Sequence, residues 1–284
     1  MRIAVIAPGA MGAGVAQRLR ARGADVAVTL QGRGPASAAR AAGLAVQASE
    51  AALARWADVI LSIVPPGEAA GLAARLAPVL CPRGAGAIFA DCNAISPDTM
   101  RAIAASLPGV PVADIAIIGG PPKGEGPSPR FYASGEPADA LRPLAGWGID
   151  LRPIAGGIGA ASALKMSYAG ISKGLVAIAS AMALGAARAG AAEALFAELA
   201  ESQPALLAQL RRSVPGMPDK AYRWVAEMEE ISAFLEGMPF APAFLAAARH
   251  YEAIAADQAQ PAPDGPVAQL AALFAPPAAG EKKP

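Results

Sequence analysis

The first feature that could do chemistry is a glycine-containing turn near the start of the chain. Residues 7–12 follow an apolar run and precede a helical pattern, and they fit the spacing G-x-G-x-x-G with alanine in the first position. Gly9 would let the backbone approach a pyrophosphate, and Gly12 would let the helix pack closely on the strand. The free amides at the start of the helix favour an anion. We therefore predict a dinucleotide site formed by Pro8, Gly9, Ala10, Met11 and Gly12.

The residues after the second apolar run indicate which dinucleotide would bind. A site for NAD usually has Asp or Glu about 20 residues past the glycines, where the carboxylate binds the ribose hydroxyls. The run Val28–Gly34 has no carboxylate and contains Arg33. A guanidinium suits a 2′-phosphate, and Ser37 adds a hydroxyl nearby. The sequence therefore favours NADP over NAD.

A strand–helix alternation positions these residues. The predicted strands are Arg2–Ala7, Asp25–Leu30, Ala57–Val64, Ala85–Ala90 and Val110–Ile118, and the predicted helices between them are Ala10–Arg22, Glu50–Trp56, Gly67–Leu80 and Ser96–Leu107. Nearly continuous apolar strands are typical of a parallel sheet covered on both faces. We predict an α/β fold class, with a Rossmann-type doubly wound parallel sheet forming a dinucleotide-binding domain over residues 1–155.

The pattern changes after Gly156–Gly159. Helical patterns without a clear strand follow at Ala160–Ala187, Ala191–Glu201, Pro204–Val214, Asp219–Glu236 and Ala241–Ala256. They predict an all-α C-terminal domain over residues 156–258, with roles in substrate binding and dimerisation. Residues 259–284 are rich in proline and alanine, which predicts a loose tail with one short helix near Val267–Phe274.

Composition excludes several classes of protein. The 284 residues are 54% hydrophobic and carry a net charge of +1, so nothing favours nucleic acid or an anionic membrane as a partner. Cys81 and Cys92 are the two cysteines and His250 is the single histidine, which predicts a reducing, cytoplasmic location and no metal site. The apolar stretch Gly174–Ala187 is shorter than the ~20 residues of a membrane helix.

Four stretches in chain order resemble the β-hydroxyacid dehydrogenase superfamily, which includes 3-hydroxyisobutyrate and 6-phosphogluconate dehydrogenases. They are Pro8–Gly12, Val64–Pro66, Asp114–Gly120 and Gly156–Lys165, and the match covers most of the first 190 residues. The resemblance implies that Val64 and Pro65 flank the nicotinamide. It also implies that Asp114–Gly120 binds substrate and that Lys165 is catalytic.

The sequence departs from the superfamily pattern at three positions. Ile118 replaces a serine, Ala161 replaces the second glycine of the catalytic motif, and Ala169 replaces an asparagine. The segments Ser162–Gly170 and Arg223–Glu230 resemble a poorly characterised subgroup of 6-phosphogluconate-dehydrogenase-like proteins with its own helical C-terminal domain. The usual substrate therefore need not apply.

Lys165 has the chemistry that carbonyl reduction requires. Hydride transfer to a carbonyl makes an alkoxide, and a lysine ammonium can stabilise that charge and donate a proton. Burial in an apolar helix would lower its pKa toward a useful range. Ala169 and Ser172 share its helix face, and Tyr168 lies one turn on. Tyr168 would either donate a proton or orient the substrate, or else pack at the domain interface.

Other candidate contacts lie at the ends of the fifth and sixth apolar runs. Ile118, Gly119 and Gly120 would line the substrate site, since the glycine amides suit a carboxylate. Asn93 would hydrogen-bond either the nicotinamide or the substrate, or else cap its own loop. Cys92 has no histidine partner in this domain, so we assign it a packing role.

These residues favour an NADP-dependent oxidoreductase that transfers a hydride between nicotinamide and a small hydroxy acid or carbonyl substrate. Lys165 would be its general acid/base. Imine reductase-like reduction of a C=N bond is an alternative, which Tyr168 supports and Lys165 opposes. A non-catalytic NADP-binding sensor is a further alternative, supported by the missing serine and asparagine. The long apolar helix indicates a homodimer.

Overall fold

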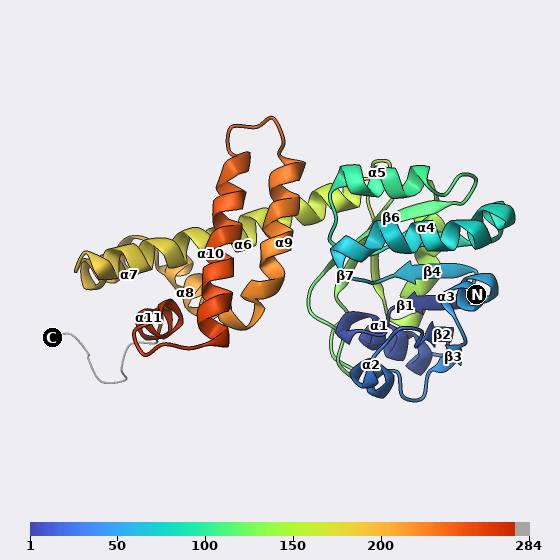
Figure 1. The fold of residues 1–284 in the computed structure, drawn as a ribbon, viewed down its shortest axis with the longest axis horizontal. Coiled ribbons are helices and arrows are strands. Elements are labelled where there is room, and N and C mark those ends of the chain that lie inside the picture. Colours follow the sequence, from blue (N-terminus) through green and yellow to red (C-terminus); the bar gives the residue numbers. More distant parts are fainter. Residues whose placement is uncertain (276–284) are drawn as a thin grey trace. The chain divides into compact units, whose positions relative to one another are not determined.

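The computed structural model describes residues 1–275, which form two compact units, Met1–Met166 and the part from Ser167 onward. The first contains every strand among the described residues, and the second is helical (Figure 1). The α/β fold with a helical C-terminal domain is therefore as predicted.

The first unit is built on one eight-stranded sheet with the order β3-β2-β1-β4-β5-β6-β7-β8. Its strands are β1 (Arg2–Ile6), β2 (Asp25–Thr29), β3 (Ala45–Gln47), β4 (Val59–Ser62), β5 (Ile88–Asp91), β6 (Val112–Ile118), β7 (Arg130–Ser134) and β8 (Asp150–Pro153). Strands β1 to β6 are parallel, but β7 runs antiparallel to β6. The predicted parallel sheet is therefore confirmed, with one antiparallel pairing, β6 with β7, near this edge.

Helices cover both faces of the sheet. They are α1 (Ala10–Ala21), α2 (Pro35–Arg40), α3 (Glu50–Trp56), α4 (Ala69–Leu80) and α5 (Pro97–Ala105), with 3₁₀ segments η1 (Pro66–Glu68), η2 (Cys81–Gly86) and η3 (Glu136–Trp147). Alternate residues of β1 enter opposite cores. Val5 packs in the core that contains Leu19 of α1, and Ile6 packs in the one that contains Leu76 of α4. The parallel strands are apolar because both of their faces are buried.

The start of α5 shows how local sequence sets a helix boundary. The Ser96 hydroxyl accepts a hydrogen bond from the Thr99 amide at 3.2 Å, and Pro97 occupies the first helical position. Asp98 lies in the first turn, where the helix dipole favours a negative charge. The predicted helix start is confirmed. The Asp91–Asn93 segment before it lies at the carboxyl end of β5.

The helix α6 (Ala160–Arg188) begins in the first unit and continues into the second. The remaining helices are α7 (Ala192–Ser202), α8 (Pro204–Ser213), α9 (Pro218–Phe234), α10 (Ala241–Ala259) and α11 (Pro266–Leu273). The short helix predicted near Val267–Phe274 is confirmed as α11. The part of the predicted tail after residue 275 lies outside the described residues.

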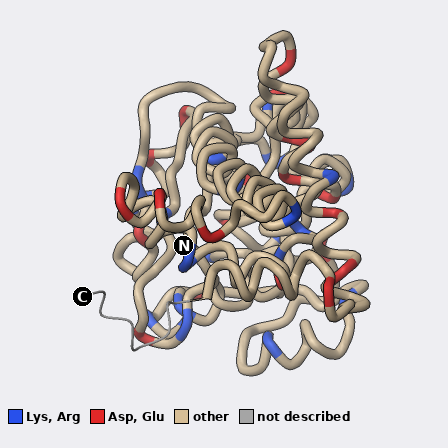
Figure 2. Tube along the Cα trace, turned by 90° about the vertical axis from the view of Figure 1, so that its left-hand side faces the viewer, with Lys and Arg blue, Asp and Glu red and all other residues tan. Residues whose placement is uncertain are grey.

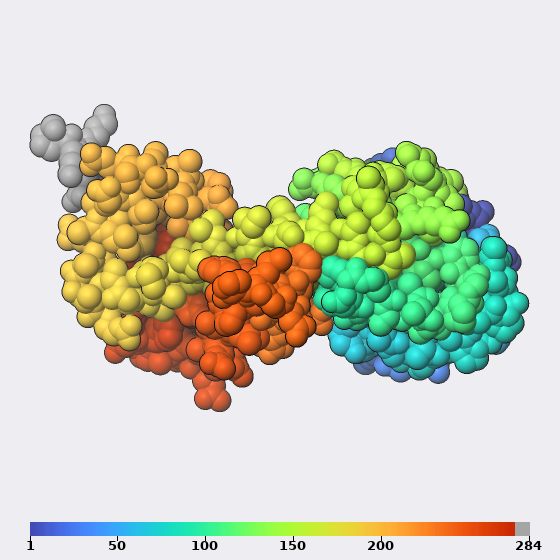
Figure 3. Space-filling view, turned by 90° about the horizontal axis from the view of Figure 1, so that it is seen from above, coloured from blue at the N-terminus to red at the C-terminus, as the bar shows by residue number. Residues whose placement is uncertain are grey.

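In the second unit, α6 packs against α9 and α10 (Figures 1 and 3). Two glycines permit the close approach of α10, because a Cβ on Gly170 or Gly174 would come within 3.3 Å of the Phe244 ring. The Tyr251 hydroxyl donates to the Lys173 carbonyl at 2.5 Å. Trp224 of α9 meets Tyr251 edge-to-face at 5.1 Å. These contacts hold the three helices together.

The helix α6 is long and apolar enough to cross a membrane by length and composition alone. Only 17% of the residues of the whole chain are charged, so a low content of charge does not distinguish α6 from the rest of the chain (Figure 2). Part of α6 is buried in the described structure, as for the core helix of a globular protein. Ile171, Ile178 and Met182 nevertheless remain exposed on it, by 75%, 56% and 62%.

Candidate active site

The carboxyl ends of the parallel strands bring most of the predicted cofactor residues to one edge of the sheet. The turn 7–12 follows β1, Arg33 follows β2, Val64 and Pro65 follow β4, and Asn93 follows β5. Gly119 and Gly120 follow β6 at the same edge. Ligands of open α/β sheets bind in the crevice along this edge.

The glycine turn has the geometry of an anion cradle. Gly9 is the N-cap of α1, no side chain caps that helix end, and a Cβ on Gly9 would have nothing within 4 Å. A Cβ on Gly12 would instead overlap the Ala7 carbonyl oxygen, so close packing of helix on strand requires glycine there. Gly9 therefore leaves open space above free helix amides, which fits the pyrophosphate of a dinucleotide. Pro8 is buried, Met11 is partly buried and Ala10 is exposed at this turn.

Arg33 is not a free cation. Its guanidinium lies 4.0 Å from the Glu50 carboxylate of α3 and 3.9 Å from that of Glu68. Glu50 also pairs with Arg75 at 2.9 Å. Ser37 lies in α2, partly exposed. The two carboxylates come from other segments of the chain, so the loop sequence around Arg33 gave no sign of them. They offset part of the positive charge of Arg33.

A buried polar network holds the loop after β4. Asn93 donates its two amide protons to the Ser62 hydroxyl at 2.9 Å and the Asp91 carboxylate at 2.8 Å. Its side-chain oxygen accepts from the Val64 amide at 2.7 Å. All of the hydrogen-bonding groups of the Asn93 side chain thus have partners inside the protein. In this structure the residue positions the Val64–Pro65 segment.

The first turn of α6 is anchored to the sheet by a buried carboxylate. Asp114, in the middle of β6, accepts hydrogen bonds from the Gly159 amide at 3.0 Å, the Ser162 amide at 2.9 Å and the Ser162 hydroxyl at 2.8 Å. Ser134 of β7 donates to Asp114 at 3.3 Å and accepts from the Ala161 amide at 3.0 Å. Charged acceptors at a helix N-terminus are strong because the dipole adds to the hydrogen bond.

This anchor places Lys165 one turn further along α6, in a charged and poorly solvated environment. Burial lowers the pKa of the Lys165 ammonium to about 8, although Cys92, Asp91 and Asp114 each oppose that shift electrostatically. Burial raises the pKa of the Asp91 carboxyl to about 6, and its neighbour Asp114 adds to the rise. Asp91 and Asp114 are register partners across β5 and β6.

Sequence reasoning gave Asp114 no role of its own, and it gave none to Ser62 or Ser134. A usable signal was present for Asp114 and Ser62, since each is a polar residue in an otherwise apolar strand and must be hydrogen-bonded when buried. The thiol of Cys92 is buried and burial raises its pKa well above the ordinary value. The structure therefore gives Cys92 the properties of a packing residue.

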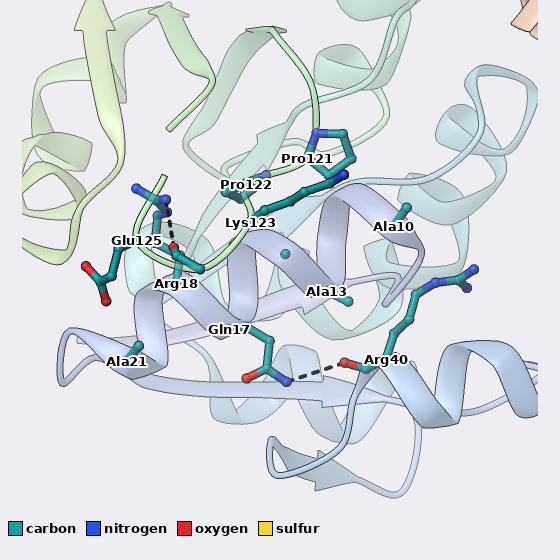
Figure 4. Close-up of a pocket in the computed structure, with 12 residues that line it drawn as sticks. Ala10, Ala13, Gln17, Arg18, Ala21, Arg40, Pro121, Pro122, Lys123 and Glu125 are labelled. Carbon is teal, nitrogen blue, oxygen red and sulfur yellow. Dashed lines mark hydrogen bonds between the residues drawn. The ribbon is translucent and has the colours of Figure 1, made fainter. Parts of the chain in front are cut away.

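The segment after β6 lies across the outer side of α1 (Figure 4). A Cβ on Gly14 would come within 2.9 Å of the Pro122 carbonyl oxygen, so Gly14 permits this contact. Arg18 of α1 donates to the carbonyl of Gly124 at 3.1 Å and to that of Gly126. A cavity of about 540 Å³ lies beside the segment, and Lys123 extends along α1 toward Ala10 within it. The segment that follows Ile118, Gly119 and Gly120 is thus fixed to the helix that opens the glycine turn.

The remaining predicted residues follow on α6 in the second unit. Tyr168 is 53% exposed and Ala169 is buried. The Ser172 hydroxyl donates to the Tyr168 carbonyl at 2.8 Å, so its proton is used within the helix. Lys173 pairs with Glu227 and lies 5.2 Å from the centre of the Trp224 ring.

His250 has a partner inside the helical unit. Its Nε2 lies 2.8 Å from the Ser180 hydroxyl, and burial lowers the pKa of the imidazole. These contacts are those of a core residue. Within residues 1–275 there is no group of three or more His, Cys, Asp or Glu side chains that could hold a metal ion.

Family models match two parts of the chain. Residues 2–141 match the NAD binding domain of 6-phosphogluconate dehydrogenase. Residues 186–254 match a domain of unknown function, DUF1932. No curated protein sequence matches the chain.

Solved structures share the whole fold. A conserved hypothetical protein from Sinorhizobium meliloti 1021 is 26% identical, with a TM-score of 0.71 and coverage of 96% of each chain. A conserved protein of unknown function, described as structurally similar to 3-hydroxyacid dehydrogenases, is 27% identical with a TM-score of 0.70, covering 91% of this chain and 99% of that one. The 3-hydroxyisobutyrate dehydrogenase of Mycobacterium tuberculosis is 22% identical with a TM-score of 0.70, covering 97% of this chain and all of that one, which shows a shared fold.

Proposed function

We propose that the chain is an oxidoreductase of the β-hydroxyacid dehydrogenase type with an NAD(P)-binding domain, and that it transfers a hydride between NADP and a small hydroxy acid or carbonyl compound. The observation that carries the proposal is the position of Lys165. It follows the anchored first turn of α6, is desolvated, and interacts electrostatically with Asp91 and Asp114 at the adjoining strands β5 and β6. Such a lysine is suited to exchange a proton near neutral pH.

In the proposed reaction the nicotinamide, when bound, donates or accepts the hydride at the substrate carbon. During carbonyl reduction the Lys165 ammonium donates its proton to the substrate oxygen as negative charge develops there, and a neutral amine remains. The amine regains a proton from solvent before the next turnover. In the oxidative direction the amine takes the proton from the substrate hydroxyl. Asp91 and Asp114 favour the charged ammonium, and so they keep its pKa from falling further.

The preference for NADP rests on Arg33 and the absence of a carboxylate in its loop. Ser37 would add a hydroxyl donor to the same phosphate. Glu50 and Glu68 counter this preference, because their carboxylates lie 4.0 and 3.9 Å from the Arg33 guanidinium and partly balance its charge. We propose that a bound 2′-phosphate displaces these carboxylates from the Arg33 guanidinium. Both contacts are long, and one of them is made by the half-exposed Glu68.

Three further features belong to the proposal. The exposed Ile171, Ile178 and Met182 recur at helical spacings on α6, and a second copy of the chain that covers this strip would make a homodimer. The chain has only two cysteines, and both are free thiols, which suits the reducing cytoplasm. Tyr168 is exposed on the same helix, and the proposal gives it a substrate-orienting role.

The first test separates binding from turnover. NADPH and NADH are titrated against the wild type, Arg33→Ala and Lys165→Met, following nicotinamide fluorescence, and NADPH consumption is then screened with small keto acids, aldehydes and imines. We expect tighter binding of NADPH than of NADH, with Arg33→Ala removing the difference. Lys165→Met should keep NADPH binding and lose carbonyl reduction. Turnover of imines alone, undiminished in Lys165→Met, would favour C=N reduction instead. Binding without any turnover would favour the sensor.

A further inference from the structure

Charged side chains lie on one face of the sheet, near the edge where β6 ends and where β7 and β8 begin. Ile118 pairs with Arg130, Arg130 with Asp150, and Tyr132 with Arg152. Paired residues of neighbouring strands point to the same face, and residues two apart along a strand do so as well. All of these side chains therefore share the face of Asp114 and Ser134, which hold the first turn of α6.

A cavity of about 580 Å³ opens at this place in the first unit. Gly119 and Gly120 form one side of it, and Arg130, Arg152, Asp150 and Lys123 contribute its charged groups. Two arginines thus meet one carboxylate at this cavity, while the Lys123 side chain extends along α1 in the other cavity. The positive excess at the cavity favours an anion.

The contacts of the two arginines and Asp150 show which guanidinium is available. Arg152 is bound on both sides, since it donates to both oxygens of Asp150 at 2.8 and 2.9 Å and stacks on the Tyr132 ring at 5.7 Å. This pairing also occupies the carboxylate of Asp150. The guanidinium of Arg130 forms no ion pair or hydrogen bond with another residue in the described part of the chain. Its charge therefore remains unneutralised beside the Gly119–Gly120 backbone.

We propose that this cavity is an anion subsite of the substrate pocket, in which Arg130 binds a carboxylate or phosphate group of the substrate. A guanidinium recognises either group through paired N–H donors, and the neighbouring glycines let the anion approach the backbone. Arg152, held by Asp150 and Tyr132, forms the second edge of the site. The assignment rests on the proposed oxidoreductase function for its biological meaning, but the subsite itself needs no nucleotide.

The test measures anion binding directly, without NADPH or turnover. Inorganic phosphate and malonate are each titrated by calorimetry, at constant ionic strength, into the wild type, Arg130→Gln and Arg142→Gln. Arg142 is the matched control, because it is an exposed arginine that pairs with Asp139 on η3, and it does not line the cavity. Loss of a charge-assisted hydrogen-bond pair should weaken binding roughly tenfold or more.

We expect Arg130→Gln to lose affinity while Arg142→Gln matches the wild type. A preference for malonate would indicate a carboxylate ligand, and a preference for phosphate would indicate a phosphorylated one. Equal affinity of all three proteins, or no saturable binding of either anion by the wild type, would overturn the subsite. Since NADPH binding is measured separately, failure of the dinucleotide site would leave this result unaffected, and the two failures can be told apart.

Discussion

Replacing Asp114 tests whether the carboxylate anchor holds the lysine helix. Asp114 accepts four hydrogen bonds, two of them from backbone amides of the first turn of α6. In Asp114→Ala the buried amides of Gly159 and Ser162 lose their acceptor. In Asp114→Asn one side-chain oxygen can still accept from both amides, and the new NH₂ group can donate to the Ser162 hydroxyl. The two substitutions therefore remove very different amounts of the anchor.

The expected losses of stability follow from the number of hydrogen bonds that each substitution removes. An unsatisfied buried amide costs about 1–3 kcal/mol, so two of them make Asp114→Ala destabilising by roughly 2–6 kcal/mol. Asp114→Asn keeps the geometry and loses the charge assistance, which we expect to cost about 1–2 kcal/mol. The same substitution removes a negative charge that favours the Lys165 ammonium, so the pKa of Lys165 should fall further below its value of about 8.

Two measurements check these expectations. Urea unfolding gives the stability of Asp114→Ala, Asp114→Asn and a control, Asp139→Asn, whose exposed ion pair with Arg142 should matter little. The pH profile of carbonyl reduction then shows whether the alkaline limb moves to lower pH in Asp114→Asn. Equal stability of Asp114→Ala and the wild type would refute the anchor. An unmoved alkaline limb would refute the electrostatic coupling to Lys165.

Three further predictions follow from other parts of the structure. Carbonyl reduction should fall with rising pH through about 8 as the Lys165 ammonium loses its proton, and oxidation should rise over the same range; kcat/KM between pH 6 and 10 without an inflection between 7 and 9 would contradict this. Gly14→Ala should destabilise the protein by about 1–3 kcal/mol through its contact with Pro122, less any gain in helix propensity, whereas Gly71→Ala, which has room, should be neutral or stabilising; thermal unfolding of both variants decides. Ile178→Asp should convert a dimer to monomers in sedimentation experiments, and a wild type that is already monomeric would remove the dimer from the proposal.

The strands that sequence reasoning found were the buried ones. Strands β1, β2, β4, β5 and β6 are nearly continuous apolar runs, because helices cover them on both sides. It missed β3, which has three residues. It also missed β7 and β8, which read RFYAS and DLRP and carry arginines on an open face. Those polar edge strands are where the sheet turns antiparallel, and where we place the anion subsite.

The site was predictable to the extent that it follows from chain order. The glycine turn, Arg33 and Lys165 each follow a strand or a break, and the parallel topology brings the strand ends to one edge. Their partners could not be read in the same way. Glu50 and Glu68 come from other segments to meet Arg33, and Asp114 meets the start of α6 across 48 residues. Such contacts depend on the tertiary fold, and a polar residue in an apolar strand is their only local sign.

The most direct test of the central claim is the affinity of NADPH for Gly9→Ala. A Cβ on Gly9 has nothing within 4 Å and φ is −69°, so the substitution should leave thermal stability nearly unchanged. Gly146→Ala, which also has open space, is the control. If the space above Gly9 belongs to a pyrophosphate, the methyl group should weaken NADPH binding about tenfold or more while the control binds normally. Unchanged NADPH affinity in a folded Gly9→Ala would contradict the account.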